Sequence, residues 1–281
     1  MSRKRYYLWA GPVEHILKAM GEGQNQVTVS TDLNRSVSTV AIHHGVAIFD
    51  AHTTLDKQQL LGIAKKKWRV FILEGNAVRI AESRDTHYRK LVPTEGAPTL
   101  EIDGVKMHRS KGIDPFDDAR EKVDQVVKTG HRVLDTCGGL GYTAIWSLRL
   151  GAREVLSVEY DNSIELLRRD NPWSQELYDQ RTTLVSADIF GFIQTLPTGT
   201  FDSILHDPPR FSLAGHLYGE DFYEQLHRVL GKGGALFHYT GMPYIVRRGD
   251  GFLASTAKRL RSVGFGIVIP KQGILGVKAV K

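Results

Sequence analysis

The second half of the chain alternates between apolar strand patterns and amphipathic helix patterns. From residue 131 the segments HRVLDT, EVLSVEYD, TTLVSAD, FDSILHD and GALFHYT are rich in β-branched and other apolar residues. A helical pattern separates each of these segments from the next, and DPFDDAREKVDQVVKTG, with a proline near its start, precedes the first. Strict alternation of this kind predicts a parallel sheet with right-handed crossover helices.

The end of the chain departs from this alternation. The apolar segments FGIVIP and ILGVKAV are separated only by KQG, Lys271–Gly273. Three residues are too few for a crossover, so these two strands must pair antiparallel. Residues 113–281 are therefore predicted to form an α/β domain, a doubly wound seven-stranded sheet that ends in an antiparallel C-terminal hairpin.

Residues 1–112 follow a different pattern of short strands and tight turns. QVTVST, SVSTVAI and GVAIFDA alternate apolar with polar residues, with a turn at 43–45. WRVFIL and AVRIAES flank a turn at 74–76, TLEIDGVKMHRS contains an Asp-Gly turn, and TLDKQQLLGIAKKK predicts a helix. We predict a small N-terminal β-rich α+β domain, with a linker inside it at LVPTEGAP, residues 91–98.

The net charge of +6 lies in this N-terminal part. Residues 1–112 hold 17 Lys+Arg against 11 Asp+Glu, whereas residues 113–281 hold 20 of each. The basic residues include the runs SRKR and AKKKWR. Two interpretations stay open: a surface that binds a polyanion such as RNA, or an ordinary solvated surface. The first makes residues 1–112 a basic accessory or substrate domain.

Composition and residue spacing limit the expected cellular compartment, membrane association and metal binding. With a single cysteine, Cys137, no internal disulfide can form, which favours a cytoplasmic protein. No apolar run approaches the ~20 residues that cross a bilayer, and the basic start is a poor signal peptide, so no membrane association is expected. Because no C-x-x-C or H-E-x-x-H spacing occurs, no metal site is predicted. No pattern specifies an oligomeric state.

The segment VLDTCGGLGYTA, Val133–Ala144, joins a buried strand to a helix through a glycine-rich turn. Ligands of doubly wound sheets bind beyond the carboxyl ends of the strands, where glycines let the backbone approach them. The glycine spacing differs from the G-x-G-x-x-G of dinucleotide sites. The alternative is a tight connection that binds nothing. The candidate binding residues are Asp135, Thr136, Cys137, Gly138, Gly139 and Gly141.

Acidic residues end the next two predicted strands. Glu159 follows Gly141 by 18 residues, the spacing at which a carboxylate binds ribose hydroxyls, and Tyr160 comes directly after it. Asp188, followed by Ile189, ends the third strand, where an aspartate can also cap a helix. Glu159 and Asp188, with their neighbours Tyr160 and Ile189, are candidate ligands of an adenosine-bearing cofactor, and His206 at the end of the fourth strand is a further candidate cofactor-binding residue. The alternative for Glu159 is an exposed strand end.

The fourth strand ends in HDPPRF, His206–Phe211. The two prolines fix φ at 208 and 209 and remove two backbone N–H donors, which leaves a carboxylate and carbonyls as acceptors for an amine. The predicted catalytic residues are Asp207, Pro208, Pro209, Arg210 and Phe211. The alternative is a rigid turn. A further hypothesis makes His206 or His238 a proton acceptor, since several histidines and tyrosines (His216, Tyr218, Tyr239) lie near strand ends.

With these motifs, residues 113–281 resemble the Rossmann-like class I S-adenosylmethionine-dependent methyltransferases. The segments IDPFDDA, DNPWSQEL and HDPPRFSLAGHLYGEDFYEQLHRVL are similar to a predicted archaeal methyltransferase family. The resemblance implies S-adenosylmethionine as the cofactor, with the glycine-rich turn and Asp135 at its methionine and ribose part. It also implies that Glu159 binds the ribose, Asp188 binds the adenine and Asp207 receives a substrate amine. Arg210 stands where amino-group methyltransferases have an aromatic ring.

A weaker resemblance points to spermidine synthases, through LEIDGVKMHRS and LYGEDFYEQLHRVLGKGG. It implies an aminopropyltransferase that uses decarboxylated S-adenosylmethionine. The chain departs from that family at its catalytic turn, D-P-P-R in place of an acidic D-S-S-D type, and has Met107 in place of a glutamine. We therefore expect a methyltransferase that N-methylates RNA or protein, with aminopropyl transfer and a non-catalytic cofactor-binding module as alternatives.

Overall fold

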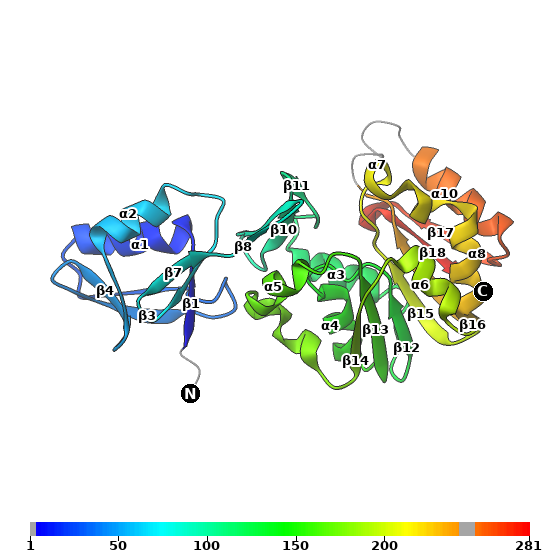
Figure 1. Ribbon diagram of the computed structural model, residues 1–281, viewed down its shortest axis with the longest axis horizontal. Coiled ribbons are helices and arrows are strands. Elements are labelled where there is room, and N and C mark those ends of the chain that lie inside the picture. Colours follow the sequence, from blue (N-terminus) through cyan, green and yellow to red (C-terminus); the bar gives the residue numbers. More distant parts are fainter. Residues whose placement is uncertain (1–3, 242–250) are drawn as a thin grey trace. The chain divides into compact units, whose positions relative to one another are not determined.

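The computed structural model describes residues 4–241 and 251–281 (Figure 1). The chain forms two compact units. The first contains residues 1–115 and 163–175, and the second contains residues 116–162 and 176–281. The first residues of the SRKR run lie outside the described part of the chain.

The second unit is built on a seven-stranded sheet with the order β14-β13-β12-β15-β16-β18-β17. Its strands are β12 (Arg132–Asp135), β13 (Glu154–Glu159), β14 (Thr182–Ser186), β15 (Phe201–His206), β16 (Leu230–Tyr239), β17 (Ile267–Lys271) and β18 (Gly276–Val280). The first five strands pair parallel, whereas β18 pairs antiparallel with both β16 and β17. The predicted fold class, a doubly wound sheet with an antiparallel C-terminal hairpin, is confirmed.

Helices cover this sheet as the alternation predicts. They are α3 (Pro115–Val123), α4 (Tyr142–Arg149), α6 (Ile189–Phe192), α7 (Phe211–Ala214), α8 (Glu220–Val229) and α10 (Gly251–Ser262), with 3-10 turns at Ile193–Thr195, Gly215–Tyr218 and Gln272–Ile274. Apolar side chains of α6, α8 and α10 share one core with the sheet, whose central strands contribute Leu134, Val158 and Ile204. Since side chains alternate along a strand, Val133 faces away from that core, and α4 packs beside β12 and β13.

The first unit has three small antiparallel sheets. Their strand orders are β1-β6-β7, β2-β3-β4-β5 and β11-β10-β9-β8. The strands are β1 (Arg5–Leu8), β2 (Gln26–Val29), β3 (Ser38–His43), β4 (Val46–Asp50), β5 (Thr53–Asp56), β6 (Phe71–Glu74), β7 (Ala77–Ile80), β8 (Glu82–Arg84), β9 (Tyr88–Val92), β10 (Thr99–Ile102) and β11 (Val105–Lys106). The expected hairpins at 43–45, 74–76 and 103–104 are therefore present, each with a glycine at positive φ.

Two helices pack on these strands, and the sequence analysis predicted only one of them. The expected helix is α2 (Lys57–Ala64), which Asp56 caps by accepting a hydrogen bond from the Gln59 N–H. The other is α1 (Ala10–Gly21). Its apolar residues Val13, Ile16, Leu17 and Met20 follow helical spacing, a signal that the basic residues before it obscured.

The segment 91–98 is not a linker. It forms the loop between β9 and β10, which pair antiparallel with Val92 opposite Thr99. Val92 and Ala97 are fully buried, and the carboxylate of Asp114 accepts a hydrogen bond from the Ala97 N–H at 2.6 Å. The glycine and prolines of this stretch therefore form a tight, packed loop.

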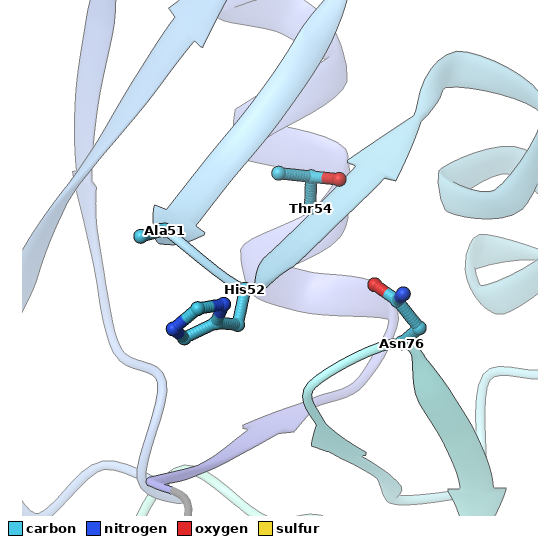
Figure 2. A pocket seen from close by; sticks show the side chains of 4 residues that line it. All are labelled: Ala51, His52, Thr54 and Asn76. Atoms are coloured by element: carbon cyan, nitrogen blue, oxygen red, sulfur yellow. The ribbon is translucent and has the colours of Figure 1, made fainter.

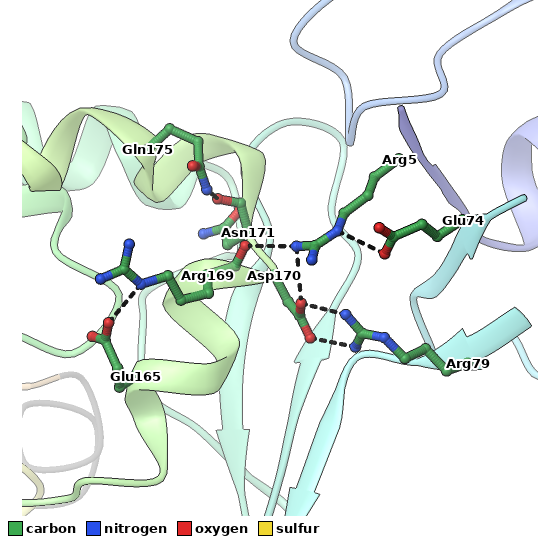
Figure 3. A network of polar contacts seen from close by, with 8 residues as sticks. All are labelled: Arg5, Glu74, Arg79, Glu165, Arg169, Asp170, Asn171 and Gln175. Atoms are coloured by element: carbon green, nitrogen blue, oxygen red, sulfur yellow. Dashed lines mark hydrogen bonds and ion pairs between the residues drawn. The ribbon is translucent and has the colours of Figure 1, made fainter. Parts of the chain in front are cut away.

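The stretch 163–175, which contains α5 (Ile164–Arg169) and the start of a 3-10 helix (Pro172–Tyr178), belongs to the first unit. Figure 3 shows how polar side chains hold it. The guanidinium of Arg79 donates two hydrogen bonds of 2.5 Å to the Asp170 carboxylate, and Arg5 lies 3.6 Å from the same carboxylate. Arg5 also pairs with Glu74. Asp170 is nearly buried, so these cations supply the charge that its burial requires.

Candidate functional site

The strand order of the second unit brings two glycine- and proline-rich turns to the same edge of the sheet. The chain runs from β12 to β13 on one side and returns to β15 on the other side of β12. This reversal of strand order is where ligands of doubly wound sheets bind, outside the carboxyl ends of the strands. The turn after β12 and the turn after β15 are hydrogen-bonded neighbours, because the Thr136 N–H donates to the Leu205 carbonyl at 3.0 Å.

Backbone hydrogen bonds fix the glycine-rich turn, and free space lies beside its residue Gly139. The Gly138 N–H donates to the Val158 carbonyl at 2.9 Å, and the Gly141 N–H donates to Gly138 at 2.7 Å. Gly139 has a φ of 46°, a left-handed conformation, and a Cβ placed on it would meet no atom within 4 Å. The turn therefore leaves room for a ligand above its backbone. Burial raises the pKa of the Cys137 thiol, so this side chain stays a neutral thiol.

Glu159 is the last residue of β13, and its side chain reaches the backbone of the glycine-rich turn. Its carboxylate accepts one hydrogen bond from the Gly139 N–H at 2.8 Å and one from the Asp161 N–H at 3.0 Å. The side chain is only half-buried. A carboxylate has about four lone-pair positions, so Glu159 keeps capacity to accept hydrogen bonds from a ligand.

Asp135 has no exposed surface. Its Oδ2 accepts hydrogen bonds from the hydroxyls of Ser157, at 2.9 Å, and Thr143, at 3.1 Å. These contacts tie β12, β13 and α4 together beneath the turn. In this structure the carboxylate supports the turn and is not displayed on its surface.

The remaining predicted cofactor residues lie along the same edge with different exposure. Asp188 is exposed, and its carboxylate caps α6 by accepting a hydrogen bond from the Phe190 N–H at 3.0 Å. Ile189 is buried in the main core. Tyr160 is 77% exposed. Of these three, Asp188 and Tyr160 present polar groups to solvent at strand ends, whereas Ile189 does not.

Asp207 lies in a charge cluster that the sequence analysis did not foresee. The ammonium of Lys122, from α3, donates to the Asp207 Oδ2 at 2.7 Å and lies 2.8 Å from Asp118. The same ammonium lies 3.8 Å from the ring centroid of Tyr239, at the end of β16. The Asp207 side chain is 23% exposed, whereas those of Lys122 and Asp118 are nearly buried. The Asp207 Oδ1 forms no hydrogen bond among the described residues.

Burial and charge act in opposite directions on this cluster. Burial alone would lower the pKa of Lys122, but the carboxylates of Asp207 and Asp118 outweigh it and raise that pKa. Burial raises the pKa of Asp207, and the Lys122 ammonium limits that rise. The lysine therefore stays charged and holds the carboxylate beside it.

The sequence contained a local indication that Lys122 is buried and paired with an acidic residue. On the helix over 115–123 the apolar positions include Ala119 and Val123, and Lys122 falls on the same stripe, four residues after Asp118. A lysine on a buried stripe needs an acidic partner, and Asp118 is at the right spacing. The contact with Asp207, 85 residues away, carries no such local signal.

The rest of the D-P-P-R-F turn is partly fixed and partly exposed. Pro208 is buried, and the Pro209 carbonyl accepts a hydrogen bond from the Tyr218 hydroxyl at 2.9 Å. Arg210 is exposed. Phe211 is 40% exposed and makes an edge contact with Tyr218, with ring centroids 5.5 Å apart. The turn thus presents one cation and one ring at the surface next to the carboxylate.

His206 and His238 are buried and have polar partners. His206 accepts a hydrogen bond from the Thr136 hydroxyl at 2.7 Å and donates one to the Leu217 carbonyl at 3.0 Å. Burial lowers the pKa of His206 to about 3. His238 is fully buried and bonds to the Tyr223 hydroxyl, and burial lowers its pKa strongly as well. Neither ring is placed to take a proton from a substrate at this edge.

Elsewhere, the first unit has a hollow of about 210 Å³ lined by Ala51, His52, Thr54 and Asn76 (Figure 2). It contains none of the residues predicted for the site. Within residues 4–241 and 251–281, no group of three or more His, Cys, Asp or Glu side chains is arranged to hold a metal ion. No helix in those ranges is long and apolar enough to span a bilayer.

Comparison with known proteins agrees with this architecture. No known family model matches the chain. A spermidine synthase crystallised with the transition-state analogue AdoDATO superposes with a TM-score of 0.59 at 19% identity, over 73% of this chain and 76% of that one. The second unit, with its seven-stranded sheet, thus belongs to the Rossmann-like folds, and the chain resembles spermidine synthases in fold.

An archaeal protein is similar to this chain over most of its length. The chain is 44% identical over 220 residues, which is 78% of this chain and 76% of the relative, to the uncharacterized protein MJ1233 of Methanocaldococcus jannaschii. The chain belongs to the family of that archaeal protein. It is also 33% identical over 118 residues to polyamine aminopropyltransferase 2 of Streptomyces coelicolor, which covers 39% of this chain but only 21% of that protein.

Proposed function

We propose that the chain is an S-adenosylmethionine-dependent methyltransferase that methylates an amino nitrogen, with RNA as the first candidate substrate. The observation that carries the proposal is the position of Asp207. Its partly exposed carboxylate lies where the strand order reverses, beside the glycine-rich turn, with Oδ2 held by Lys122 and Oδ1 directed to no described partner.

The residues of this edge fit an adenosine-bearing cofactor. The open space above Gly139, the acceptor capacity of Glu159 and the exposed carboxylate of Asp188 support binding of the methionine part, the ribose and the adenine in that order. Asp135 would act through the turn that it supports. When bound, S-adenosylmethionine supplies an electrophilic methyl group.

The residues that would bind the methyl-accepting substrate suit a neutral amine. An uncharged amino group already has a nucleophilic lone pair, so it needs orientation more than it needs a base. The Asp207 Oδ1 would accept a hydrogen bond from the amine N–H and direct the lone pair. Lys122 fixes the carboxylate, while Arg210 and Phe211 would contact the rest of the substrate.

Aminopropyl transfer is the second candidate. The fold likeness to a spermidine synthase and the 33%-identical segment of a polyamine aminopropyltransferase favour it. The exposed cation Arg210 opposes it, because a diamine carries ammonium groups that would meet this side chain at the turn. For this reason we place methyl transfer first.

The test is methyl transfer from labelled S-adenosylmethionine to fractionated RNA, protein and metabolites. We expect Asp207→Ala to lower transfer by about 100-fold or more, because misplacing the acceptor nitrogen by ~1 Å costs that much, while calorimetric cofactor affinity changes little. Asp202→Asn, near the amino end of the same strand, is the control and should keep full activity. Full activity of Asp207→Ala would overturn the role of this turn.

Calorimetry distinguishes the alternatives. Methyl transfer predicts tighter binding of S-adenosylmethionine and S-adenosylhomocysteine than of the decarboxylated cofactor. The reverse preference, together with transfer to a diamine, would establish the aminopropyltransferase. Binding with no transfer to any fraction would indicate a non-catalytic module.

A further inference from the structure

Trp68, in the first unit, is an exposed aromatic ring among cations. It lies in the connection between α2 and β6 and is 62% exposed. The ammonium of Lys106, from β11, lies 5.2 Å from the centroid of its ring. An indole with this exposure leaves a large planar surface available for contact. The lysine adds a positive charge at that surface.

A second ring, that of Tyr88, has the same type of neighbour. Tyr88, at the start of β9, has the guanidinium of Arg69 5.8 Å and that of Arg84 5.7 Å from its ring centroid. Arg69, whose guanidinium contacts the Tyr88 ring, directly follows Trp68 in the chain, so we treat the two rings as parts of one surface. We call it the Trp68–Tyr88 surface, formed by Trp68, Arg69, Arg84, Tyr88 and Lys106.

Nearby acids balance only part of the charge of this surface. The three lysines before Trp68, residues 65–67, are exposed, as is Lys106, and none of these four has a carboxylate at ion-pair distance in the described part of the chain. The acidic side chains of the adjoining strands already have partners. Glu82 pairs with Arg69 and also accepts a hydrogen bond from the Tyr88 hydroxyl, and Asp85 pairs with Arg89. Asp103 contacts the His87 ring. The net local charge is therefore positive.

We propose that the Trp68–Tyr88 surface binds single-stranded RNA. Bases would stack on the two rings, and the lysines and Arg84 would contact phosphates, the combination that sequence-tolerant single-strand binding uses. Each ring lies next to a cation and not within an apolar cluster, which suits a base flanked by phosphates better than insertion into lipid. The inference rests on the proposed function only in taking RNA as the substrate class.

The experiment measures binding of the full chain to a fluorescein-labelled single-stranded RNA of about 16 nucleotides by anisotropy, over a range of salt concentrations. Trp68→Ala is expected to weaken binding roughly 5- to 150-fold, the range for loss of one stacked base. Trp68→Phe, which keeps a ring, should retain most of the affinity.

The charge contribution has its own variant and control. Lys106→Gln should weaken binding and lower the slope of log affinity against log salt by about 0.7, the value for one single-strand phosphate contact. Lys232→Gln removes an equal charge from an exposed position near the amino end of β16 and should change neither quantity.

The outcomes separate this inference from the proposed function. If Trp68→Ala binds RNA as tightly as the unmodified chain, the inference is wrong, whether or not methyl transfer occurs. Binding to anionic phospholipid vesicles but not to RNA would also overturn it, in favour of a lipid surface. If RNA binding depends on Trp68 but no methyl transfer occurs, the RNA-binding inference is supported and only the proposed function is refuted.

Discussion

At the residue scale, burial decides the chemistry of the two histidines at the ends of β15 and β16. His206 has both ring nitrogens in hydrogen bonds, and His238 bonds to Tyr223. Water cannot solvate an imidazolium at either position, so both rings stay neutral when ordinary histidines would titrate. They bind the strand ends to the neighbouring turn and helix.

This burial predicts a pH dependence of stability. The pKa of His206 is about 3 in the folded chain, against 6.5 ordinarily, and that of His238 is also depressed. As the pH falls below about 6.5, the unfolded chain binds protons that the folded chain does not. The stabilisation from His206 is therefore complete above that pH and is lost progressively toward pH 3, by about 1.4 kcal/mol per pH unit, and His238 acts in the same direction.

Urea unfolding between pH 5 and pH 7 measures this dependence. His206→Gln removes one titrating group and should reduce the slope of the unfolding free energy against pH, by about 1.4 kcal/mol per unit near pH 5 and by little near pH 7. Burial also lowers the pKa of His227. This histidine contributes equally to the slope in both proteins, so its contribution cancels in the comparison. Equal slopes for the two proteins would contradict the assignment of His206 as a buried neutral group.

At the scale of elements, the start of α4 depends on one glycine. Gly141 has a φ of 86°, and a Cβ on it would lie 2.5 Å from the Leu177 Cδ2. Leu177 is fully buried and has no room to move aside. The glycine-rich turn therefore needs Gly141 both for its backbone conformation and for its packing.

We expect Gly141→Ala to lower the free energy of unfolding by about 1–3 kcal/mol and to weaken cofactor binding. Gly191→Ala is the matched control. Gly191 lies inside α6, and a Cβ there would meet no atom within 4 Å, so alanine should leave stability unchanged or raise it slightly. Urea unfolding of the two variants checks both expectations. Similar stabilities for both would show that the turn tolerates a side chain.

At the scale of the whole molecule, each unit is assembled from two stretches of chain. The first unit takes residues 163–175 from the middle of the α/β region. Within that unit the Trp173 indole donates to the Leu33 carbonyl at 2.7 Å, and Arg35 donates to the Pro172 carbonyl at 2.6 Å. The domain boundary between residues 112 and 113 stays a prediction. The contacts of residues 163–175 within the first unit can be tested by mutation.

The variant Arg79→Ala tests how much the ion pair with Asp170 stabilises this stretch in the first unit. Arg79→Ala leaves the nearly buried Asp170 with Arg5 as its remaining cation, at 3.6 Å. Because Arg79 is partly exposed and its charge is screened by solvent, we expect a modest loss of about 1–2 kcal/mol in the free energy of unfolding. Thermal or urea unfolding measures the change.

Arg181→Ala is the control for this variant. The Arg181 side chain has the same 46% exposure as that of Arg79, but its partner Asp179 is 35% exposed whereas Asp170 is 11% exposed. Its removal should have a distinctly smaller effect, because an exposed carboxylate is solvated when it loses its partner. If the two variants lost the same stability, burial of Asp170 would not be the reason for the cost.

Local patterns were enough to predict the fold class and the positions of the two turns. The alternation of strands and helices defines a parallel sheet, and the three-residue connection KQG forces the last two strands to be antiparallel. Strand ends at Asp135, Glu159 and Asp207 then follow, because the carboxyl ends of parallel strands share one edge. These conclusions rest on periodicity and connection length, which the sequence contains directly.

The tertiary structure alone decided which groups meet and which are buried. It brought Lys122 to Asp207 and placed Asp135 beneath the turn. It also assigned residues 163–175 to the first unit. The physical reason is that a side chain's partner and its exposure depend on residues far away in the chain, whereas a periodic pattern reports only which face of an element is apolar.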